Sequence, residues 1–198
     1  MCSVYEFGRG KKKPPQALNA GGFDSLADDV RLIRRTDKAP VYLSDGSVHM
    51  MRWGYERPGL GVVNNTRSDN FESPMWRDSI EHRRCLIPVT AFYEWSGPKG
   101  NKRTHRFTSR DGGWLWMAGI WETADKLGEC FSMITTAANA LMSPIHNRMP
   151  AVLTDKELNP FLDGELMKFN PAPETLRVND ARNPLLKNPP SHVQDELF

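Results

Sequence analysis

The hydrophobic and polar residues along the chain follow the pattern of a protein built mainly from short β-strands. Runs of three to eight residues are rich in β-branched and aromatic side chains, and turn-forming residues bound them, as is typical of strands. The predicted strands lie at residues 41–43, 48–53, 86–89, 91–95, 106–108, 114–121 and 130–135.

Helical signals are fewer. Ser73 followed by Pro74 is typical of an N-cap and a first helical residue, which predicts a helix through about His82. Residues 138–142 and 155–162 are further short candidates. The predicted fold class is therefore α+β: a single domain built around curved, mainly antiparallel β-sheet with a few short helices.

Two segments differ from this strand-rich pattern. Residues 8–22 contain Lys-Lys-Lys-Pro-Pro, which predicts a surface loop. Residues 183–198 are rich in proline and are predicted to be mobile. We therefore expect one domain over residues 1–182, followed by a mobile tail.

Length and composition agree with a globular protein. The chain has 198 residues, enough for one sizeable core, and its six Trp and nine Phe argue against disorder. Its longest apolar run, near residues 113–121, is too short to span a bilayer, and residues 1–20 lack the apolar core of a secretion signal. We expect a soluble, cytoplasmic protein without a membrane partner.

The three cysteines are odd in number and far apart, and no CxxC motif or Cys/His cluster is present. Neither a disulfide framework nor a structural zinc site is indicated, and no metal or other cofactor is expected. Cys85 and Cys130 lie in apolar settings and are predicted to be buried.

The charge is unevenly distributed. Residues 1–150 carry 21 Lys and Arg against 16 Asp and Glu, whereas residues 151–198 carry 5 against 8. Basic clusters interleaved with Trp and Tyr give a weak indication of a polyanionic ligand, and a solvated surface is the alternative for any one cluster.

Cys2 is the first residue with candidate chemistry, because it becomes N-terminal once Met1 is removed. Its α-amine, with a pKa near 7.7–8.0 in general, can form a Schiff base with an aldehyde. The adjacent thiol can then close a five-membered thiazolidine ring, which no internal cysteine can do. The alternative is a cysteine without a role.

Glu94 and His146 are candidate proton carriers. Glu94 lies in an aromatic, strand-forming pentad and is a candidate general acid or base, unless strand alternation points it to water. His146 lies between two prolines and close to Arg148, a setting that suits proton transfer beside a phosphate. A hydrogen-bonded structural histidine is the alternative.

Two further segments have polar or aromatic residues suited to a nucleic acid. The polar stretch at residues 64–69 supplies Asn and Arg for a phosphodiester, although an ordinary turn fits equally well. Trp53 and Gly54 place a large ring beside a flexible residue, which suits stacking on a base or simple core packing.

The order of these short blocks is more specific than any one of them. The blocks are Met1-Cys2, Arg52-Trp53-Gly54, Asn65-x-Arg67-Ser68-Asp69, residues 83–88 (Arg-Arg-Cys-Leu-Ile-Pro), 92–95 (Phe-Tyr-Glu-Trp), 134–139 (Ile-Thr-Thr-x-Ala-Asn) and 144–150 (Pro-Ile-His-x-Arg-Met-Pro). Over roughly residues 1–155 the chain resembles the SRAP family of abasic-site-processing proteins.

This resemblance implies a DNA-damage function. Members bind single-stranded DNA and crosslink covalently to abasic sites through the N-terminal cysteine, which shields the sites from cleavage. The implied partners are single-stranded DNA with abasic sites and the replication machinery. A monomer is implied, located in the cytoplasm and at the nucleoid if the chain is bacterial.

The resemblance also implies roles for particular residues. Cys2 matches the nucleophile, and Asn65 matches the residue that orients the sugar and the amine. Glu94 matches the acid/base carboxylate, and His146 matches the histidine that helps to open the deoxyribose. The matches for DNA contacts are Arg67 and Arg148 for phosphates, Trp53 and Gly54 for the segment where DNA bends, and Thr135 for a backbone contact.

The chain departs from the family pattern at two places. Ser3-Val4 replaces the usual Gly-Arg, so an expected DNA-contacting arginine is missing, and Arg9 or residues 11–13 are candidates to replace it. Asp69 stands where Glu is commoner. Two other functions remain as alternatives: a self-processing thiol peptidase that cleaves after Met1, and a non-catalytic single-strand-binding module.

Overall fold

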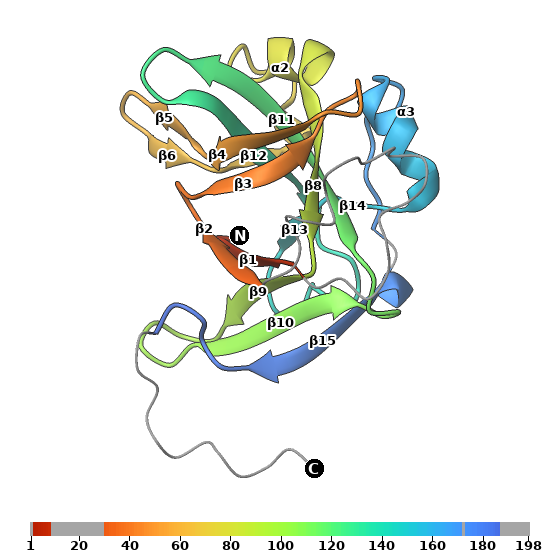
Figure 1. The fold of residues 1–198 in the computed structure, drawn as a ribbon. Coiled ribbons are helices and arrows are strands. Elements are labelled where there is room, and N and C mark those ends of the chain that lie inside the picture. The colour runs from red at the N-terminus through yellow and green to blue at the C-terminus, as the bar shows by residue number, and fades with distance from the viewer. Residues whose placement is uncertain (1, 9–29, 172, 187–198) are drawn as a thin grey trace.

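The computed structural model describes residues 2–8, 30–171 and 173–186, and it consists mainly of two curved β-sheets (Figure 1). The five-stranded sheet has the order β15-β10-β9-β1-β2. Its strands are β1 (Val4–Phe7), β2 (Arg31–Arg34), β9 (Ala91–Ser96), β10 (Arg103–Ser109) and β15 (Leu176–Ala181). All four neighbouring pairs in this sheet are antiparallel.

The eight-stranded sheet has the order β13-β12-β4-β3-β8-β11-β14, with β7 paired to β12. β12, β4, β3, β8 and β11 are neighbours in that order, and β11 also pairs with β12. These five strands therefore close into a small barrel. The strands are β3 (Lys38–Tyr42), β4 (Val48–Trp53), β7 (Asn65–Arg67), β8 (Arg84–Val89), β11 (Leu115–Ala124), β12 (Gly128–Ala137), β13 (Arg148–Pro150) and β14 (Val152–Leu153). A separate hairpin consists of β5 (Tyr55–Arg57) and β6 (Gly61–Val63).

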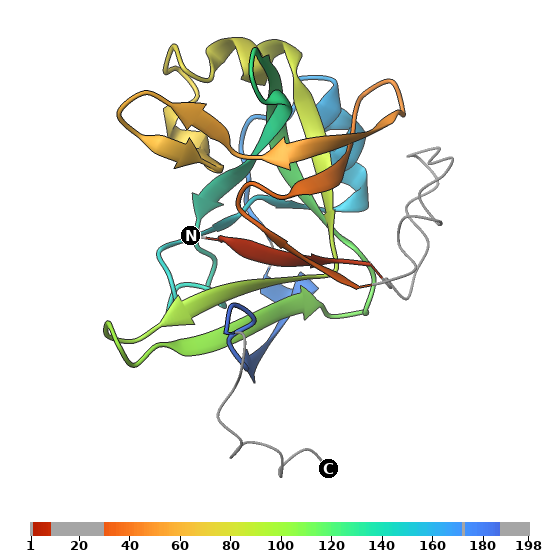
Figure 2. The same ribbon diagram turned by 60° about the vertical axis from the view of Figure 1, so that its left-hand side comes forward.

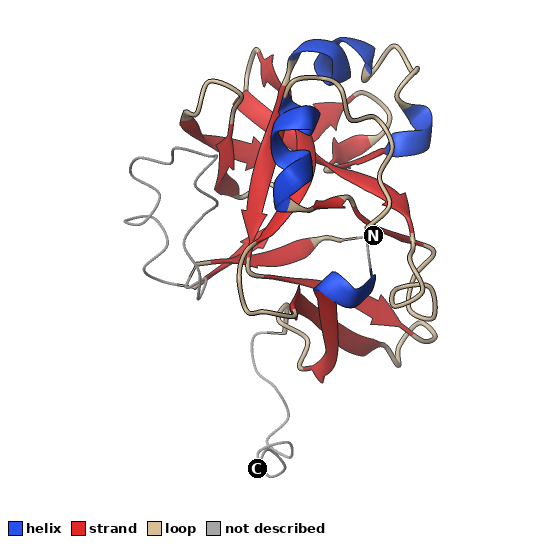
Figure 3. Cartoon of the chain, turned by 90° about the vertical axis from the view of Figure 1, so that its right-hand side faces the viewer, coloured by secondary structure: helices blue, strands red, loops and turns tan. Residues whose placement is uncertain are grey.

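The helices are short and lie outside the sheets (Figure 3). They are η2 (Ser68–Asn70), α2 (Arg77–His82), η3 (Asp155–Glu157), α3 (Leu158–Leu162) and η4 (Pro173–Thr175). The two sheets enclose an aromatic core in which Trp53, Trp116 and Tyr42 are fully buried. The expected α+β single domain of curved, mainly antiparallel sheet is confirmed. Within the described ranges, no helix combines the length and apolar character that a bilayer crossing requires.

The seven predicted strands are all present, most of them longer than predicted. The predicted helix at Ser73 begins later, at Arg77, because residues 73–76 form turns with Trp76 N–H and Arg77 N–H both donating to Ser73 O. The predicted helix at residues 138–142 is wrong. There the side chain of Asn139 accepts hydrogen bonds from the N–H groups of Leu141 and Met142, which fixes a turn.

The prediction for residues 155–162 is confirmed as η3 followed directly by α3. The predicted surface loop at residues 8–22 lies outside the described residues except for Gly8, and so do Arg9 and residues 11–13. The predicted tail lies outside them from residue 187 onward. Val4, where the resemblance leads one to expect arginine, is fully buried in β1.

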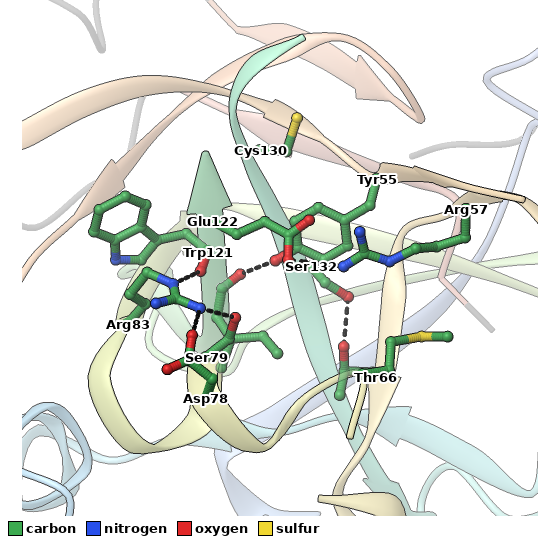
Figure 4. Close-up of polar contacts among 12 residues, drawn as sticks. Tyr55, Arg57, Thr66, Asp78, Ser79, Arg83, Trp121, Glu122, Cys130 and Ser132 are labelled. Atoms are coloured by element: carbon green, nitrogen blue, oxygen red, sulfur yellow. Dashed lines mark hydrogen bonds and ion pairs between the residues drawn. The ribbon is translucent and has the colours of Figure 1, made fainter. Parts of the chain in front are cut away.

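Strand β7 is fixed to β12 by a buried side-chain contact as well as by backbone pairing (Figure 4). Thr66 Oγ1 and Ser132 Oγ are 2.8 Å apart, and both side chains are fully buried. This pair matters for the site because β7 begins at Asn65.

We expect Thr66→Val and Ser132→Ala each to lower the free energy of unfolding by about 1–3 kcal/mol, since each leaves one buried hydroxyl without its partner. Urea unfolding of the two variants measures this. The double variant removes both hydroxyls and should cost less than the sum of the single changes. A strictly additive double variant would show that the two hydroxyls do not interact.

Candidate functional site

Cys2 lies two residues before the first residue of β1 and is held in place through its own backbone. Its carbonyl oxygen accepts hydrogen bonds from Nδ2 of Asn65 at 2.9 Å and Nδ2 of Asn64 at 3.3 Å. The thiol is only 1% exposed and donates to Val4 O at 3.4 Å. The structure thus brings the predicted nucleophile and the predicted Asn65 into direct contact.

Asn64 and Asn65 are positioned by the core of the barrel. The carbonyl oxygen of Asn64 accepts hydrogen bonds from Trp53 Nε1 at 2.8 Å and from Met133 N–H at 3.1 Å. Asn65 begins β7, where it pairs in parallel register with Met133 of β12. The two amides therefore approach Cys2 from a rigid part of the fold.

Glu94 is buried beside Cys2. It lies on β9, which pairs with β1, and its side chain is only 2% exposed. The alternative that strand alternation points Glu94 to water is therefore wrong. Burial, followed by the charge of Glu94, raises the pKa of the Cys2 thiol well above its usual range. The thiol is thus protonated at neutral pH, and attack by its sulfur requires a base nearby.

His146 lies in the partly exposed turn before β13. Its Nδ1 lies 2.9 Å from Arg148 N and 3.1 Å from Arg148 O, so the ring is held against the backbone of Arg148. The histidine is therefore hydrogen-bonded, as expected of a structural histidine, and it lies in a partly exposed segment next to Arg148.

Arg67, Asp69 and Arg148 form a connected surface cluster. Arg67 contacts Asp69 through two bonds, Nε to Oδ1 at 2.9 Å and Nη2 to Oδ2 at 2.6 Å. Arg148 reaches the same carboxylate with Nη1 at 3.2 Å and donates from Nη2 to Thr135 O at 2.5 Å. The bonds from Arg67 lower the pKa of Asp69 to about 2, so this carboxylate is ionised near neutral pH.

The neighbouring strands explain this cluster. Arg67 of β7 pairs with Thr135 of β12, and Arg148 of β13 pairs with Ala137 of the same strand. Thr135 is itself buried, and its backbone oxygen accepts the bond from Arg148. Two positive charges and one negative charge leave the group with a net positive charge.

Trp53 requires a correction. Its ring is fully buried, 5.0 Å from the ring of Tyr5 and stacked on Phe131, so the core-packing alternative holds and the ring has no surface for a DNA base. Gly54 is also buried and has a φ of +112°. A Cβ at that position would lie 2.8 Å from Val62 Cγ1, which explains why glycine occupies position 54.

Part of the support for the site could not be predicted from the sequence. Glu6 accepts hydrogen bonds from Arg106 Nε at 3.0 Å, from Arg106 Nη2 at 2.6 Å and from Tyr93 Oη. Although burial alone would raise it, these bonds lower the pKa of Glu6. The network ties the Cys2 strand to β9 and β10, and only the pairing of the strands places these distant residues together.

The hairpin that leads to Asn64 is also anchored by charge. Arg57 Nη2 lies 2.7 Å from Glu122 Oε2 of β11 (Figure 4). The guanidinium group of Arg57 also stacks over the rings of Tyr55 and Trp76. These contacts fix β5 and β6 against the barrel. The segment that carries the two asparagines is therefore held at both ends.

Comparison with known proteins gives one matching family and several relatives. The sequence model of one family, described as SOS response associated peptidase (SRAP), matches residues 1–185. The abasic site processing protein YoqW of Bacillus subtilis is 32% identical over 138 residues, which is 61% of this chain and 61% of that protein. The abasic site processing protein YedK of Escherichia coli is 27% identical over 157 residues, covering 70% of this chain and 68% of that protein.

Solved structures show the same fold. A protein from Bacteroides thetaiotaomicron superimposes with a TM-score of 0.73 at 23% identity, covering 90% of this chain and 92% of that one. A protein from Bordetella bronchiseptica gives 0.71 at 20% identity, covering 92% and 100%.

Proposed function

Since the chain belongs to the SRAP family, we propose that it binds single-stranded DNA and crosslinks covalently to abasic sites through Cys2. The observation that carries the proposal is the setting of Cys2, whose carbonyl is fixed by Asn65 and whose thiol lies beside the buried Glu94. As part of a DNA-damage response, the crosslink would shield the site from cleavage. We propose that the protein acts as a cytoplasmic monomer, at the nucleoid if bacterial.

The chemistry begins after Met1 is removed. The amine of Cys2 attacks the aldehyde of the opened deoxyribose, and loss of water gives a C=N bond. The sulfur then adds to the imine carbon, forming a C–S bond. The thiol proton leaves sulfur and the imine nitrogen gains a proton, so the ring closure needs no oxidant.

Glu94 and His146 would transfer the protons that the reaction has to move. An abasic sugar is mostly a closed hemiacetal, so a proton must move from its hydroxyl to the ring oxygen before the aldehyde is available. We assign that step to His146 and assign the protons of the amine and thiol to Glu94. Because the thiol of Cys2 is protonated at neutral pH, a carboxylate beside it supplies the base that the attack needs.

The proposal is tested with a single-stranded oligonucleotide that carries one abasic site. We expect a heat-stable protein–DNA band on a denaturing gel, whose mass equals that of protein lacking Met1 plus DNA minus one water. The same oligonucleotide without the lesion is the control. If no covalent product forms with protein that lacks Met1, the proposal is wrong and the non-catalytic binding alternative gains support.

A thiol peptidase is disfavoured by the same setting. Catalytic cysteines of peptidases generally have a lowered pKa, which makes the thiolate available. Burial and the charge of Glu94 have the opposite effect on Cys2. Protein produced without methionine aminopeptidase separates the two functions, because a self-processing peptidase would still lose Met1.

Arg67 and Arg148 are proposed to contact phosphates. We expect Arg67→Ala and Arg148→Ala each to weaken binding to every undamaged single strand alike and to reduce the slope of log K against log salt by about 0.7. Asp69→Asn should have the opposite effect and strengthen binding, since it removes the negative charge that pairs with both arginines. Fluorescence anisotropy across a salt series measures all three. A change of base preference would contradict the assignment to phosphates.

A further inference from the structure

A second group of reactive side chains lies in the five-stranded sheet, on β9, β10 and β15, which lie side by side in Figures 1 and 2. Ser96 Oγ is 2.7 Å from Nε2 of His105, and Nδ1 of the same ring is 3.4 Å from Asp180 Oδ1. A hydroxyl on Nε2 and a carboxylate facing Nδ1 is the order of atoms in a serine–histidine–acid triad.

The strand register explains why the three residues meet. His105 of β10 is paired with Asp180 of β15, so the two side chains lie on one face of the sheet. His105 is also paired with Glu94 of β9, and Ser96 lies two residues further along that strand on the same face. This places the second group next to the proposed crosslinking site but on other residues.

The burial of the three side chains suits a nucleophile that a reagent can reach. His105 is only 8% exposed, so its ring is held by its neighbours, whereas Ser96 is partly exposed at the end of β9. The residues that follow Ser96, 97–102, are all exposed and form the turn into β10. The carboxylate of Asp180 is 64% exposed, and its Oδ2 lies 3.5 Å from Arg103 Nε, which helps to orient it.

The carboxylate also selects the tautomer of His105. A carboxylate facing Nδ1 favours a proton on that nitrogen, which leaves Nε2 as the acceptor. The hydroxyl of Ser96 then donates to Nε2, and the imidazole can take its proton as the oxygen attacks. Each of the three residues therefore has the position that its part in nucleophilic catalysis requires.

We propose that Ser96 is an activated nucleophile toward carboxylic esters, with His105 as general base and Asp180 as the positioning residue. Ser96 Oγ forms a bond to the carbonyl carbon while its proton passes to His105 Nε2. The bond from that carbon to the ester oxygen breaks, and the leaving oxygen receives the proton. Water then attacks the acyl carbon and passes a proton to His105 Nε2, the bond from that carbon to Ser96 Oγ breaks, Oγ takes the proton back, and the carboxylic acid leaves.

The activity is independent of the proposed crosslinking, because neither Cys2 nor DNA takes part. The test uses the full-length protein and two probes, a fluorophosphonate that forms a stable adduct with an activated serine, and p-nitrophenyl acetate as the ester. Peptide mapping of the fluorophosphonate adduct identifies the labelled residue. We expect labelling at Ser96 and the release of p-nitrophenol beyond one equivalent.

His105→Gln should reduce the rate of labelling by about 10²-fold, the usual effect of losing a general base. Asp180→Asn should reduce it by less. Ser96→Ala should abolish the adduct, and Ser109→Ala is the matched control, because Ser109 donates to Asp111 rather than to a histidine and its loss should change nothing. Thermal unfolding of each variant separates a loss of activity from a loss of fold.

Labelling of Ser96 at the same rate in wild type and in a folded His105→Gln variant would overturn the proposal. Absence of any adduct at Ser96 would also overturn it, and the contact would then be a structural hydrogen bond. Neither result bears on crosslinking to abasic DNA, which is measured separately with the lesion-bearing oligonucleotide.

Discussion

Cys2→Ser is expected to abolish the heat-stable crosslink to an abasic site while leaving the amine able to react. The serine amine still forms an imine with the aldehyde, but the hydroxyl does not give the stable sulfur-containing ring. The imine hydrolyses when the sample is heated. Denaturing electrophoresis should therefore show a strong product for the wild type and none for the variant.

Reduction with borohydride makes this test sharper. It converts an imine into a stable amine, so the Cys2→Ser product should appear only when borohydride is present. The wild-type product should need no reductant. Cys130→Ala is the matched control, because Cys130 is a buried internal cysteine that lacks an α-amine of its own and should not affect crosslinking. A heat-stable product from Cys2→Ser without reductant would contradict the thiazolidine mechanism.

Much of the strand content could be predicted from the sequence, because strands such as β8, β9 and β12 combine β-branched and aromatic residues with clear boundaries. Other strands lack that signal. β15, with the sequence Leu-Arg-Val-Asn-Asp-Ala, is half polar and forms because β10 offers it six paired residues. The pairing that closes the barrel, β11 with β12, is likewise a long-range property of the whole chain.

The site was predictable to a similar degree. The order of short blocks identified Cys2, Asn65, Glu94 and His146 as candidates, and the structure places the first three together around β1, β7 and β9. The sequence could not show whether the Glu94 side chain points into the protein or to water. Strict strand alternation would bury only one of the neighbours Tyr93 and Glu94, yet both are buried.

Trp53 illustrates the opposite difficulty. An aromatic residue beside a glycine suits base stacking and core packing equally well, and the sequence alone does not choose between them. The buried ring decides the matter, since it donates to Asn64 O and thereby helps to fix the amides that hold Cys2. A residue predicted to touch DNA therefore supports the site from within the core.

Glu94→Gln and His146→Ala are expected to slow crosslinking by about 10²-fold each, the usual effect of losing one general acid or base. Glutamine keeps the size of the Glu94 side chain but cannot accept a proton from the Cys2 thiol. Alanine at position 146 removes the ring that would assist opening of the sugar. Neither change should much weaken binding to undamaged single strands, because neither residue is assigned to a phosphate.

The double variant tests whether the two residues act together. If both act in one transition state, its rate should exceed that expected from adding the two barrier increments. Single-turnover crosslinking of the four proteins, with binding measured in parallel, gives these rates. Glu81→Gln is the control, because Glu81 is exposed on α2 and lies beside His82, so its loss should leave the rate unchanged. Crosslinking of Glu94→Gln at the wild-type rate would show that this buried carboxylate is structural and that another group accepts the proton of the thiol.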